Sequence, residues 1–449
     1  MIITDTHLFN FDDLTLNENV HIVIDKSTIS QIIKKADAPR AYEEILHTSG
    51  KLLKLKYREV INGKNKLVIP GLANCHSHTA MTLLRGSAED VNSLDWFNKY
   101  IWLYEKNLQP EDVYWGTLLG AAEMLLSGVT FVCDHYFAMD NAYKAYKDAG
   151  MRADLGWAIF GQGNRWEEEY RTALDFTEEY RGKEETITVS LAPHSPYICP
   201  RDFLAETAKY AEKENLKTHI HVSEEPWQVE KSINQTGKTP VEYLADLGVI
   251  RENSILAHAC YATDSDLKII KERKALAAHA PKTYMKFGFL NDFLPRALNE
   301  QIRIALASDG PASNSTLSIF EAARDAALLS KLSTGDPEKG KIKDIVPLLS
   351  SGYSLLGNGC SGAVAAGSRA DLVLLSRKSV SMNPEINIGA GILYSLSDRD
   401  VHTVIVNGSV VVSGGRLITI NLDNVLKNVN KIKKRMLSAG GTPMQNFGI

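Results

Sequence analysis

The sequence lacks a disulfide framework. Its five cysteines, an odd number in 449 residues, are widely spaced and include no Cys-x-x-Cys pair, which argues against both structural disulfides and a cysteine zinc site. The chain also has no apolar run of about 18 residues, the length a membrane-spanning helix needs. Its N-terminal segment shows no basic stretch followed by an apolar core, so it does not read as a secretory signal. We therefore expect a reduced, cytoplasmic setting and no membrane partner.

An excess of positive charge is also absent. The 50 Lys and Arg residues stand against 54 Asp and Glu residues, and the formal net charge is −4. Proteins that bind nucleic acid or anionic membranes favour basic surfaces, so we expect no nucleic-acid partner. The length allows one large α/β domain with a smaller one, or two to three ordinary domains.

The middle of the chain alternates short apolar runs, which end in polar residues, with longer amphipathic segments typical of helices. Eight such runs lie at 72–78, 128–136, 153–160, 186–194, 216–224, 254–259, 275–281 and 302–310. Continuous apolar strands between helices indicate a parallel sheet covered on both faces. Eight strands in about 240 residues match a (β/α)8 TIM-like barrel. The alternative, an open doubly wound sheet, usually carries Gly-x-Gly-x-x-Gly after its first strand, and GLANCHSH is not that fingerprint.

The two ends of the chain show a different pattern from the middle. Short β-like runs separated by turns occur in the first 65 or so residues and again in the last ninety, as in VHTVIVNGSVVVSGG at 401–415. The Asn-Gly and Gly-Gly pairs in these stretches signal tight turns. We predict a barrel domain over 69–361 and a composite β-domain formed by 1–68 together with 362–449.

Histidine is concentrated in the predicted strands. Eight of the twelve histidines lie in these eight runs, most of them near the C-terminal end, where barrels of this kind form their active sites. His76 and His78 share one face of a strand, and such a pair suits half of a metal site better than an apolar core. His221 ends the fifth run and Asp309 ends the eighth. Three imidazoles and a carboxylate suit Zn²⁺, and Fe²⁺ would also fit.

Two more residues near these strand ends could handle protons, which metal-assisted hydrolysis also requires. Glu224 lies three residues after His221, where the strand gives way to a loop, and His258 ends the sixth strand. Taken singly, each has a structural interpretation: a surface loop carboxylate, or a buried histidine bonded to the backbone. Their combination with the predicted ligands favours a hydrolytic site.

Several segments are familiar. PGLANCHSH, HVSE, LAHA and SDG, in this order and at these spacings, resemble the amidohydrolase superfamily of metal-dependent hydrolases. CHSHTAMTLLRGSAED and DGPASNSTLSIFEAAR resemble its aminohydrolase branch, which includes S-adenosylhomocysteine/methylthioadenosine deaminases, guanine-type deaminases and triazine chlorohydrolases. The resemblance covers nearly the whole chain. It implies a (β/α)8 barrel, a small β-sandwich domain completed by both chain ends, and a homo-oligomer.

The resemblance also implies one metal ion, Zn²⁺ with Fe²⁺ as the alternative, with His76, His78, His221 and Asp309 as ligands. A second metal is not expected, because no lysine stands at the strand end where two-metal relatives carry one. His219, two residues before the third histidine ligand, is expected to line the barrel beneath the metal.

The implied reaction is hydrolytic deamination. A metal-bound hydroxide attacks the ring carbon that bears the amine, and Asp309 takes the proton. Glu224 protonates the neighbouring ring nitrogen, His258 steadies the tetrahedral centre, and ammonia leaves. The implied substrate is a small heterocycle: an adenosine-type nucleoside such as S-adenosylhomocysteine or methylthioadenosine, or a related purine or pterin.

Substrate-binding candidates follow from the same resemblance. Glu105 matches a residue that binds ribose hydroxyls, His194 one that contacts the ring, and Arg165 one that holds an amino-acid tail. Trp96 and Trp102 lie in an aromatic insert after the first strand, where they could stack on a flat heterocycle or simply pack within helices.

Two segments of the chain depart from the family pattern. Trp157 stands near the place of an expected second arginine, and Lys282, Thr283 and Tyr284 replace small polar residues after the seventh strand. Lys282 could bind an acidic substituent of the substrate or simply be solvated. These departures leave the metal chemistry untouched and bear on the substrate alone.

Two functions other than deamination are alternatives for a chain with these residues. A hydrolase with the same mechanism could expel another leaving group, such as chloride from a triazine. A non-catalytic scaffold with this fold is the third possibility, but such proteins typically lose metal ligands, and all the predicted ligands are present here.

Overall fold

The computed structural model describes residues 1–37, 59–161, 166–357 and 362–438. Its centre is an eight-stranded, all-parallel sheet in the order β13-β12-β11-β10-β9-β8-β7-β6. The strands are β6 (Leu72–Ser77), β7 (Val129–Tyr136), β8 (Arg152–Ile159), β9 (Ile187–Pro193), β10 (Lys217–Val222), β11 (Ser254–His258), β12 (Leu276–His279) and β13 (Arg303–Leu306).

Seven of these strands fall within one of the predicted runs and β8 begins one residue before its run, so the predicted barrel is confirmed. Its two edge strands meet where the backbone N–H of Asp309 donates to the carbonyl of His76 at 2.9 Å. The strand interiors are almost wholly buried, as expected for strands covered on both faces.

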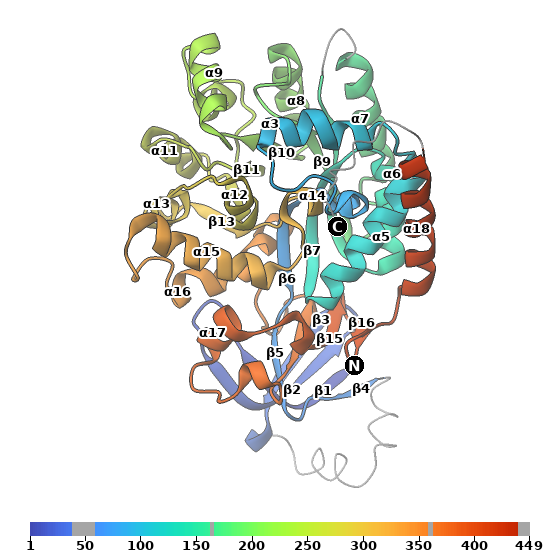
Figure 1. Cartoon of the computed structure of the whole chain (residues 1–449). Coiled ribbons are helices and arrows are strands. Elements are labelled where there is room, and N and C mark those ends of the chain that lie inside the picture. The colour runs from blue at the N-terminus through green and yellow to red at the C-terminus, as the bar shows by residue number, and fades with distance from the viewer. Residues whose placement is uncertain (38–58, 162–165, 358–361, 439–449) are drawn as a thin grey trace.

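Helices surround the barrel (Figure 1). Several begin with Pro at the first position or with a capping box, both of which satisfy the free N–H groups of a first turn. The helices around the barrel are α5 (Pro110–Leu126), α6 (Met139–Ala149), α7 (Trp166–Tyr180), α8 (Arg201–Lys213), α9 (Pro226–Thr236), α10 (Pro240–Asp246), α11 (Asp264–Glu272), α12 (Pro281–Phe287), α13 (Phe293–Asn299), α14 (Pro311–Asn314), α15 (Ile319–Thr334) and α16 (Ile342–Ile345), with the 3-10 turns η5 (Val346–Leu349) and η6 (Ser351–Leu356) after them.

The insert between β6 and α5 consists of short helical turns. They are η2 (Thr79–Leu84), α3 (Ser93–Asp95), the π-helix η3 (Trp96–Ile101) and α4 (Trp102–Glu105). In Figure 1, α3 lies across the barrel beside β10, near the ends of the strands.

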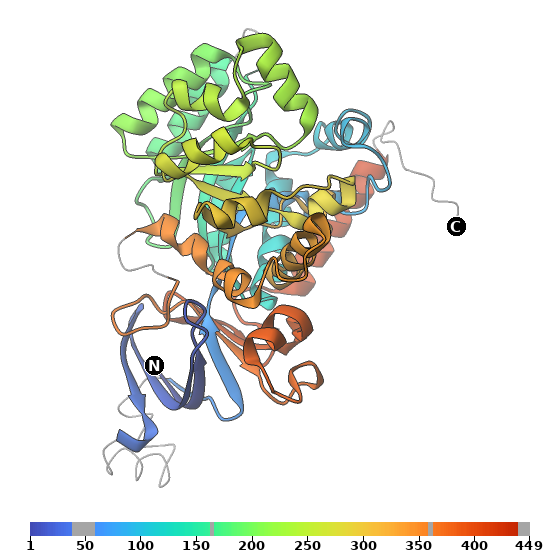
Figure 2. The same ribbon diagram turned by 90° about the vertical axis from the view of Figure 1, so that its left-hand side faces the viewer.

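Both ends of the chain build a second, nine-stranded mixed sheet, which lies below the barrel in Figure 2. Its order is β17-β16-β15-β14-β5-β1-β2-β3, and β4 pairs with β1. The small β-domain predicted from both chain ends is thus confirmed, while its boundaries at 68 and 362 stay a prediction. The strands are β1 (Ile2–Phe9), β2 (Leu16–Asp25), β3 (Thr28–Lys34), β4 (Val60–Asn62), β5 (Lys66–Pro70), β14 (Leu372–Ser376), β15 (Val401–Val406), β16 (Ser409–Ser413) and β17 (Arg416–Leu417).

Shorter elements complete this part of the chain: η1 (Lys35–Asp37), η7 (Val380–Met382), α17 (Ile388–Ala390), η8 (Gly391–Ser395) and η9 (Asp398–Asp400). The C-terminal helix α18 (Leu422–Ser438) leaves the sheet and lies beside α5 of the barrel (Figure 1), where Arg435 pairs with Asp112.

The barrel and the sheet are joined directly. Gly71 separates β5 from β6, and a Cβ at this position would lie 2.0 Å from the Thr130 hydroxyl oxygen, so the close passage requires glycine. Arg152 of β8 forms a buried ion pair with Asp371, 3.0 Å from its Oδ2, and also donates to Asn407 Oδ1 at 3.1 Å. These contacts fix the barrel on the sheet.

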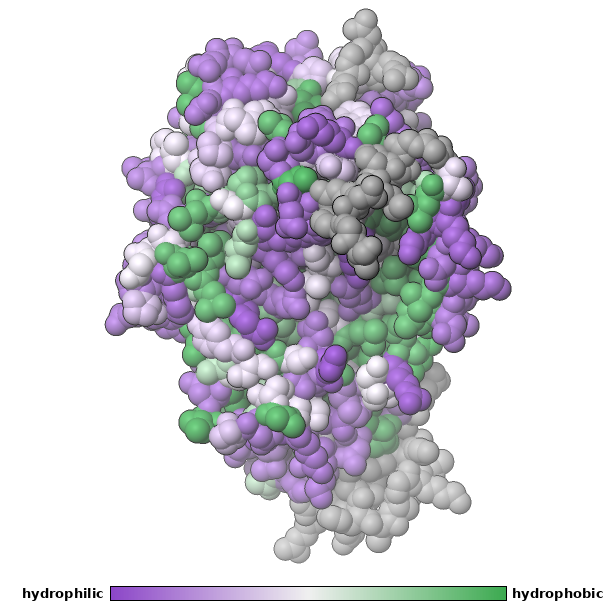
Figure 3. All heavy atoms as spheres, viewed as in Figure 1, coloured by the Kyte–Doolittle hydropathy of each residue, from purple (hydrophilic) through white to green (hydrophobic). Residues whose placement is uncertain are grey.

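The face of the molecule in Figure 3 is largely hydrophilic, with hydrophobic residues in two main areas, one on the left on the side of α12–α15 and one to the right of the centre. Met285, Leu290, Leu328 and Leu332 of this segment are exposed. Within the described ranges, no helix combines the length and the hydrophobicity needed to cross a bilayer.

The buried carboxyl group of Asp398 should make the free energy of unfolding depend on pH. Its carboxylate accepts a hydrogen bond from Ser318 Oγ at 2.8 Å, and burial raises its pKa from 3.8 to about 6. The folded state therefore binds this proton more tightly than the unfolded chain does, and the free energy of unfolding falls as pH rises from about 4 to 6. Asp398→Asn keeps an acceptor for Ser318 without the buried charge.

We expect this variant to be more stable than the parent by about 2 kcal/mol at pH 8 and nearly equal to it at pH 4. Urea unfolding at the two pH values measures the difference. A stability difference that is the same at both would contradict the assignment.

Candidate active site

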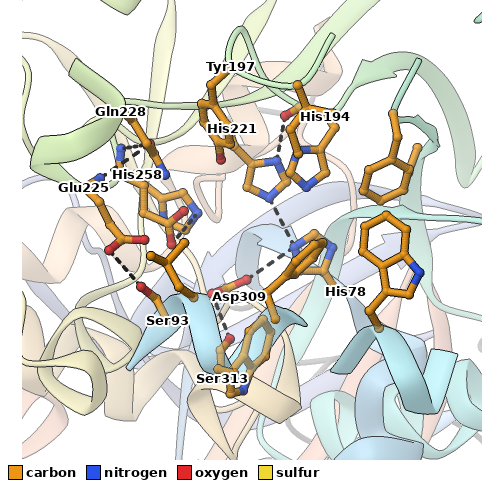
Figure 4. Close-up of a pocket in the computed structure, with 18 of the residues that line it drawn as sticks. His78, Ser93, His194, Tyr197, His221, Glu225, Gln228, His258, Asp309 and Ser313 are labelled. Atoms are coloured by element: carbon orange, nitrogen blue, oxygen red, sulfur yellow. Dashed lines mark hydrogen bonds and ion pairs between the residues drawn. The ribbon is translucent and has the colours of Figure 1, made fainter. Parts of the chain in front are cut away.

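Three of the four predicted ligand residues, His78, His221 and Asp309, line one cavity of about 320 Å³ at the C-terminal ends of the barrel strands (Figure 4), and the buried His76 lies beside them. The Nε2 atoms of His78 and His221 are 3.2 Å apart. Asp309 Oδ1 lies 3.4 Å from His78 Nε2 and 3.6 Å from His76 Nε2. Two overlapping groups of side chains have donor atoms within 4.8 Å of one another: His76 with His78 and His221, and His76 with His258 and Asp309.

Backbone carbonyls fix which nitrogen of two imidazoles carries the proton. His78 Nδ1 lies 2.5 Å from the carbonyl oxygen of His135, and His221 Nδ1 lies 2.8 Å from that of His194. A carbonyl can only accept, so both Nδ1 atoms donate. In the neutral rings the two facing Nε2 atoms then carry lone pairs, which cannot hydrogen-bond to each other.

His76 completes the set. Its Nδ1 is 2.8 Å from His219 Nε2, and its Nε2 is buried without a hydrogen-bond partner among the described residues. His219 lies deeper in the barrel, as expected. Histidine nitrogens and a carboxylate oxygen that lie this close together in a buried site fit a divalent metal ion.

Burial keeps four imidazoles of the site neutral. Loss of hydration, together with the neighbouring histidines, holds the pKa values of His76 and His221 well below the usual 6.5. Burial likewise lowers the pKa of His194 to about 3 and that of His258 to about 4. A neutral imidazole is the form that binds a metal.

Asp309 is held by two residues that the sequence analysis did not single out for this role. Thr283 Oγ1 and Ser313 Oγ both donate to Asp309 Oδ2, at 3.0 and 2.8 Å, which leaves Oδ1 free to face the histidines. The backbone of Asp309 is left-handed, with φ 62°. Gly310 follows because a Cβ there would lie 2.7 Å from Met81 Sδ and 3.4 Å from His78 Cβ.

Glu224 lies on the opposite side of the cavity from β6. Its Oε1 is 3.7 Å from His258 Nε2. Burial, reinforced by the carboxylates of Asp309 and Glu225, raises its pKa to about 8. A carboxyl group with this value is protonated at neutral pH and can act as an acid.

Three of the four predicted substrate-binding residues line the cavity, and Arg165 lies outside the described residues. Glu105 Oε1 accepts a hydrogen bond from Tyr136 Oη at 2.7 Å, and burial raises its pKa. His194 stacks on Phe160 with ring centroids 4.7 Å apart. Trp96 lines the cavity while its Nε1 donates to the Ala312 carbonyl at 3.3 Å.

Trp102 also lines the cavity, with its ring 6.3 Å from that of Phe160. The aromatic insert after the first strand therefore forms one wall of the cavity, as the sequence suggested.

Lys282 forms polar contacts within the protein that neither interpretation of the sequence had included. Its ammonium group pairs with Glu321 at 2.6 Å and donates to Thr316 at 3.0 Å, and it is not among the residues that line the cavity. Trp157 packs on Phe176 of α7, with ring centroids 5.5 Å apart, and only its neighbour Ala158 reaches the cavity.

Gln228 is a residue of the site that was not predicted from the sequence. Its buried side chain accepts the backbone N–H of Glu224 at 2.9 Å. Its signal was present: Glu225, Pro226 and Gln228 open a helix in the pattern of a capping box. The carbonyl of His135 was also missed, since a carbonyl's role leaves no mark in the sequence.

The barrel and this cluster define a class: (β/α)8 hydrolases with a metal site at the C-terminal ends of the strands. The amidohydrolase family model matches residues 67–411, and the chain belongs to this family. The predicted family is confirmed, and with it a hydrolytic enzyme acting on C–N bonds.

Two relatives match almost the entire chain. A 5-methylthioadenosine/S-adenosylhomocysteine deaminase of Caldanaerobacter subterraneus subsp. tengcongensis is 33% identical, over 97% of this chain and 98% of that protein. A 5'-deoxyadenosine deaminase of Methanosphaera stadtmanae is 34% identical, over 92% of this chain and 98% of that protein.

Solved structures share the fold. A zinc-bound adenosine deaminase of Xanthomonas campestris superposes with a TM-score of 0.88 at 24% identity, covering 97% of this chain and 98% of that one. A zinc complex of atrazine chlorohydrolase from Arthrobacter aurescens has a TM-score of 0.85 at 20% identity, covering 96% of this chain and 99% of that one.

Proposed function

We propose that this enzyme is a metal-dependent hydrolytic deaminase of an amino-substituted heterocycle, with an adenosine-type nucleoside such as methylthioadenosine or S-adenosylhomocysteine as substrate and ammonia as product. The observation that carries the proposal is a pair of carboxyl groups on one cavity, one facing the predicted metal ligands and one with a raised pKa. Asp309 Oδ1 faces the histidines, while Glu224 is protonated at neutral pH. The names of the two relatives support the nucleoside class.

We propose that His76, His78, His221 and Asp309 hold one metal ion, Zn²⁺ rather than Fe²⁺. The buried nitrogen set and the partnerless Nε2 of His76 support the site. The bound metal supplies Lewis acidity, which lowers the pKa of water so that a nucleophile is available near neutral pH.

The side chains divide the proton transfers between them. Asp309 accepts the proton of the attacking water at Oδ1, because Thr283 and Ser313 occupy Oδ2. Glu224 donates its proton to the ring nitrogen beside the carbon under attack, which makes that carbon more electrophilic. His258 holds the developing oxyanion, Glu105 binds the ribose hydroxyls and His194 contacts the ring.

A second candidate is a hydrolase that expels a different leaving group, as the atrazine chlorohydrolase with the same fold is named for doing. The residues above fit either departing atom. The test is ammonia release by zinc-loaded enzyme from methylthioadenosine, S-adenosylhomocysteine, 5'-deoxyadenosine, adenosine, guanine and a pterin, with chloride release from atrazine in parallel. Chelator-sensitive ammonia release from a nucleoside supports the proposal, and chloride release alone contradicts it.

We further propose a cytoplasmic location and a homo-oligomer. The described cysteines Cys75, Cys133, Cys199 and Cys260 are all free and buried, which suits a reducing compartment. Light scattering of the purified protein measures the oligomeric state, and a monomer at micromolar concentration would contradict that part.

His219 offers a test of the metal site that does not depend on the substrate. It faces His76 Nδ1 and thereby orients a ligand ring. We expect His219→Phe to weaken zinc retention about 10- to 100-fold, measured by competition with a chromophoric chelator. His279→Phe is the matched control, because His279 is also buried in a barrel strand but has no ligand beside it within hydrogen-bond distance. Equal zinc retention in the two variants would contradict this role of His219.

A further inference from the structure

The insert after β6 is fastened over the cavity by separate polar contacts. Ser93 Oγ donates to Glu225 Oε2 at 2.8 Å, Trp96 Nε1 donates to the Ala312 carbonyl, and Lys286 pairs with Glu89 at 2.6 Å. The contact of Ser93 differs from the others because Glu225 is the neighbour of Glu224. In Figure 4, Ser93 and Glu225 face each other on the side of the cavity that lies opposite His78.

Glu225 is the N-cap residue of α9. It opens the helix together with Gln228 in the pattern of a capping box, in which the backbone N–H of Glu225 donates to Gln228 Oε1 at 3.4 Å. A movement of the insert that breaks the contact with Ser93 thus acts on the residue that begins α9.

Gln228 carries the connection on to the reacting group. Its side chain is 2% exposed, and its Oε1 accepts the backbone N–H of Glu224 at 2.9 Å and that of Glu225 at 3.4 Å. Ser223, the residue before Glu224, has a left-handed backbone with φ 47°. A non-glycine residue in this region is strained, so the turn needs contacts to hold it.

We propose that Ser93, Glu225 and Gln228 are positioning residues through which docking of the insert places the Glu224 carboxyl group for proton transfer. Ser93 fixes Glu225, the capping box fixes Gln228, and Gln228 fixes the backbone of Glu224. The inference rests on the proposed function, because it takes Glu224 as the proton donor.

Helix capping alone does not require this arrangement. The helix α10 has a capping box between Thr239 and Glu242 in which each side chain accepts a backbone N–H of the other residue. That box joins neither the insert nor a residue of the cavity. The start of α9 therefore differs from that of α10 by two additional hydrogen bonds, one from Ser93 to Glu225 and one from the N–H of Glu224 to Gln228.

The kinetic test compares kcat and KM for the best nucleoside substrate. We expect Ser93→Ala to lower kcat about tenfold and Gln228→Leu to lower it about 100-fold, since small misplacements of a reacting group have effects of this size. Ser93→Thr, which keeps a hydroxyl, should restore most of the rate. Glu242→Gln, in the box of α10, should leave kcat unchanged.

The double variant Ser93→Ala/Gln228→Leu should be no slower than Gln228→Leu alone, because both changes break one connection. Multiplying effects would overturn the proposal. An effect of Ser93→Ala confined to KM would also overturn it, since the insert would then act on substrate binding alone.

Hydrogen exchange followed by mass spectrometry decides the proposal without any substrate. Ser93→Ala should accelerate amide exchange both in residues 91–105 of the insert and in the turn 223–229. Glu242→Gln should accelerate exchange in neither segment. Faster exchange in the insert alone would overturn the connection. Absence of ammonia release from every nucleoside would instead count against the proposed function, while the exchange result would still stand.

Discussion

The Asp309→Asn variant is expected to lose turnover by about 10³-fold and to retain zinc poorly. The substitution removes both the negative charge and the proton-accepting oxygen that faces His76 and His78. If the amide oxygen keeps the hydrogen bonds from Thr283 and Ser313, the NH₂ group faces the histidines, where it can hydrogen-bond to their lone pairs but cannot bind a metal ion or accept a proton. In the other orientation the NH₂ group meets the two donating hydroxyls, and the oxygen that faces the histidines carries no charge.

Two measurements check this prediction. Ammonia release gives kcat, and elemental analysis after dialysis against a chelator gives the zinc retained per chain. Asp398→Asn is the matched control, because it exchanges the same atoms at a buried carboxylate remote from the cavity. Near-normal activity of Asp309→Asn would end its assignment as ligand and base.

The Glu224→Gln variant is expected to keep its zinc and to lose about 10²- to 10⁴-fold in kcat. Glu224 approaches His258 but belongs to neither group of converging donor atoms, so its loss should leave the ligands intact. Glutamine preserves the size of the side chain and the backbone bond to Gln228, but its amide cannot deliver a proton to the ring.

Zinc content and kcat are measured as for Asp309, with Glu230→Gln as control, because Glu230 is an exposed residue of α9 outside the cavity lining. Loss of zinc from Glu224→Gln would make Glu224 a ligand. Unchanged kcat would remove it from the proton transfer.

The strands and the residues at their ends were predictable from the sequence, because both are encoded locally. A buried parallel strand needs a short apolar run, and the barrel brings the C-terminal end of every strand to one face. His76, His78, His221 and Asp309 each end or follow such a run, so their meeting required only the order of the strands.

The contacts that tune the site could not be predicted in this way. Lys282 meets Glu321, 39 residues away, through the packing of α12 on α15, and no local pattern encodes that distance. Thr283 and Ser313 reach Asp309 from two different helices. Such side chains gain their role only when the loops after the strands are folded, which a reading along the chain does not supply.

The order of the small sheet has a consequence for synthesis on the ribosome. Strand β5, which runs directly into β6 and the first histidines, lies between β1 and β14. When the barrel strands emerge, β1 can already pair with β5, but its other edge stays open until β14 is made about 300 residues later. An open strand edge invites pairing with other chains. Nascent or C-terminally truncated chains should therefore depend on chaperones that shield this edge, although every residue of the metal site has already been synthesised.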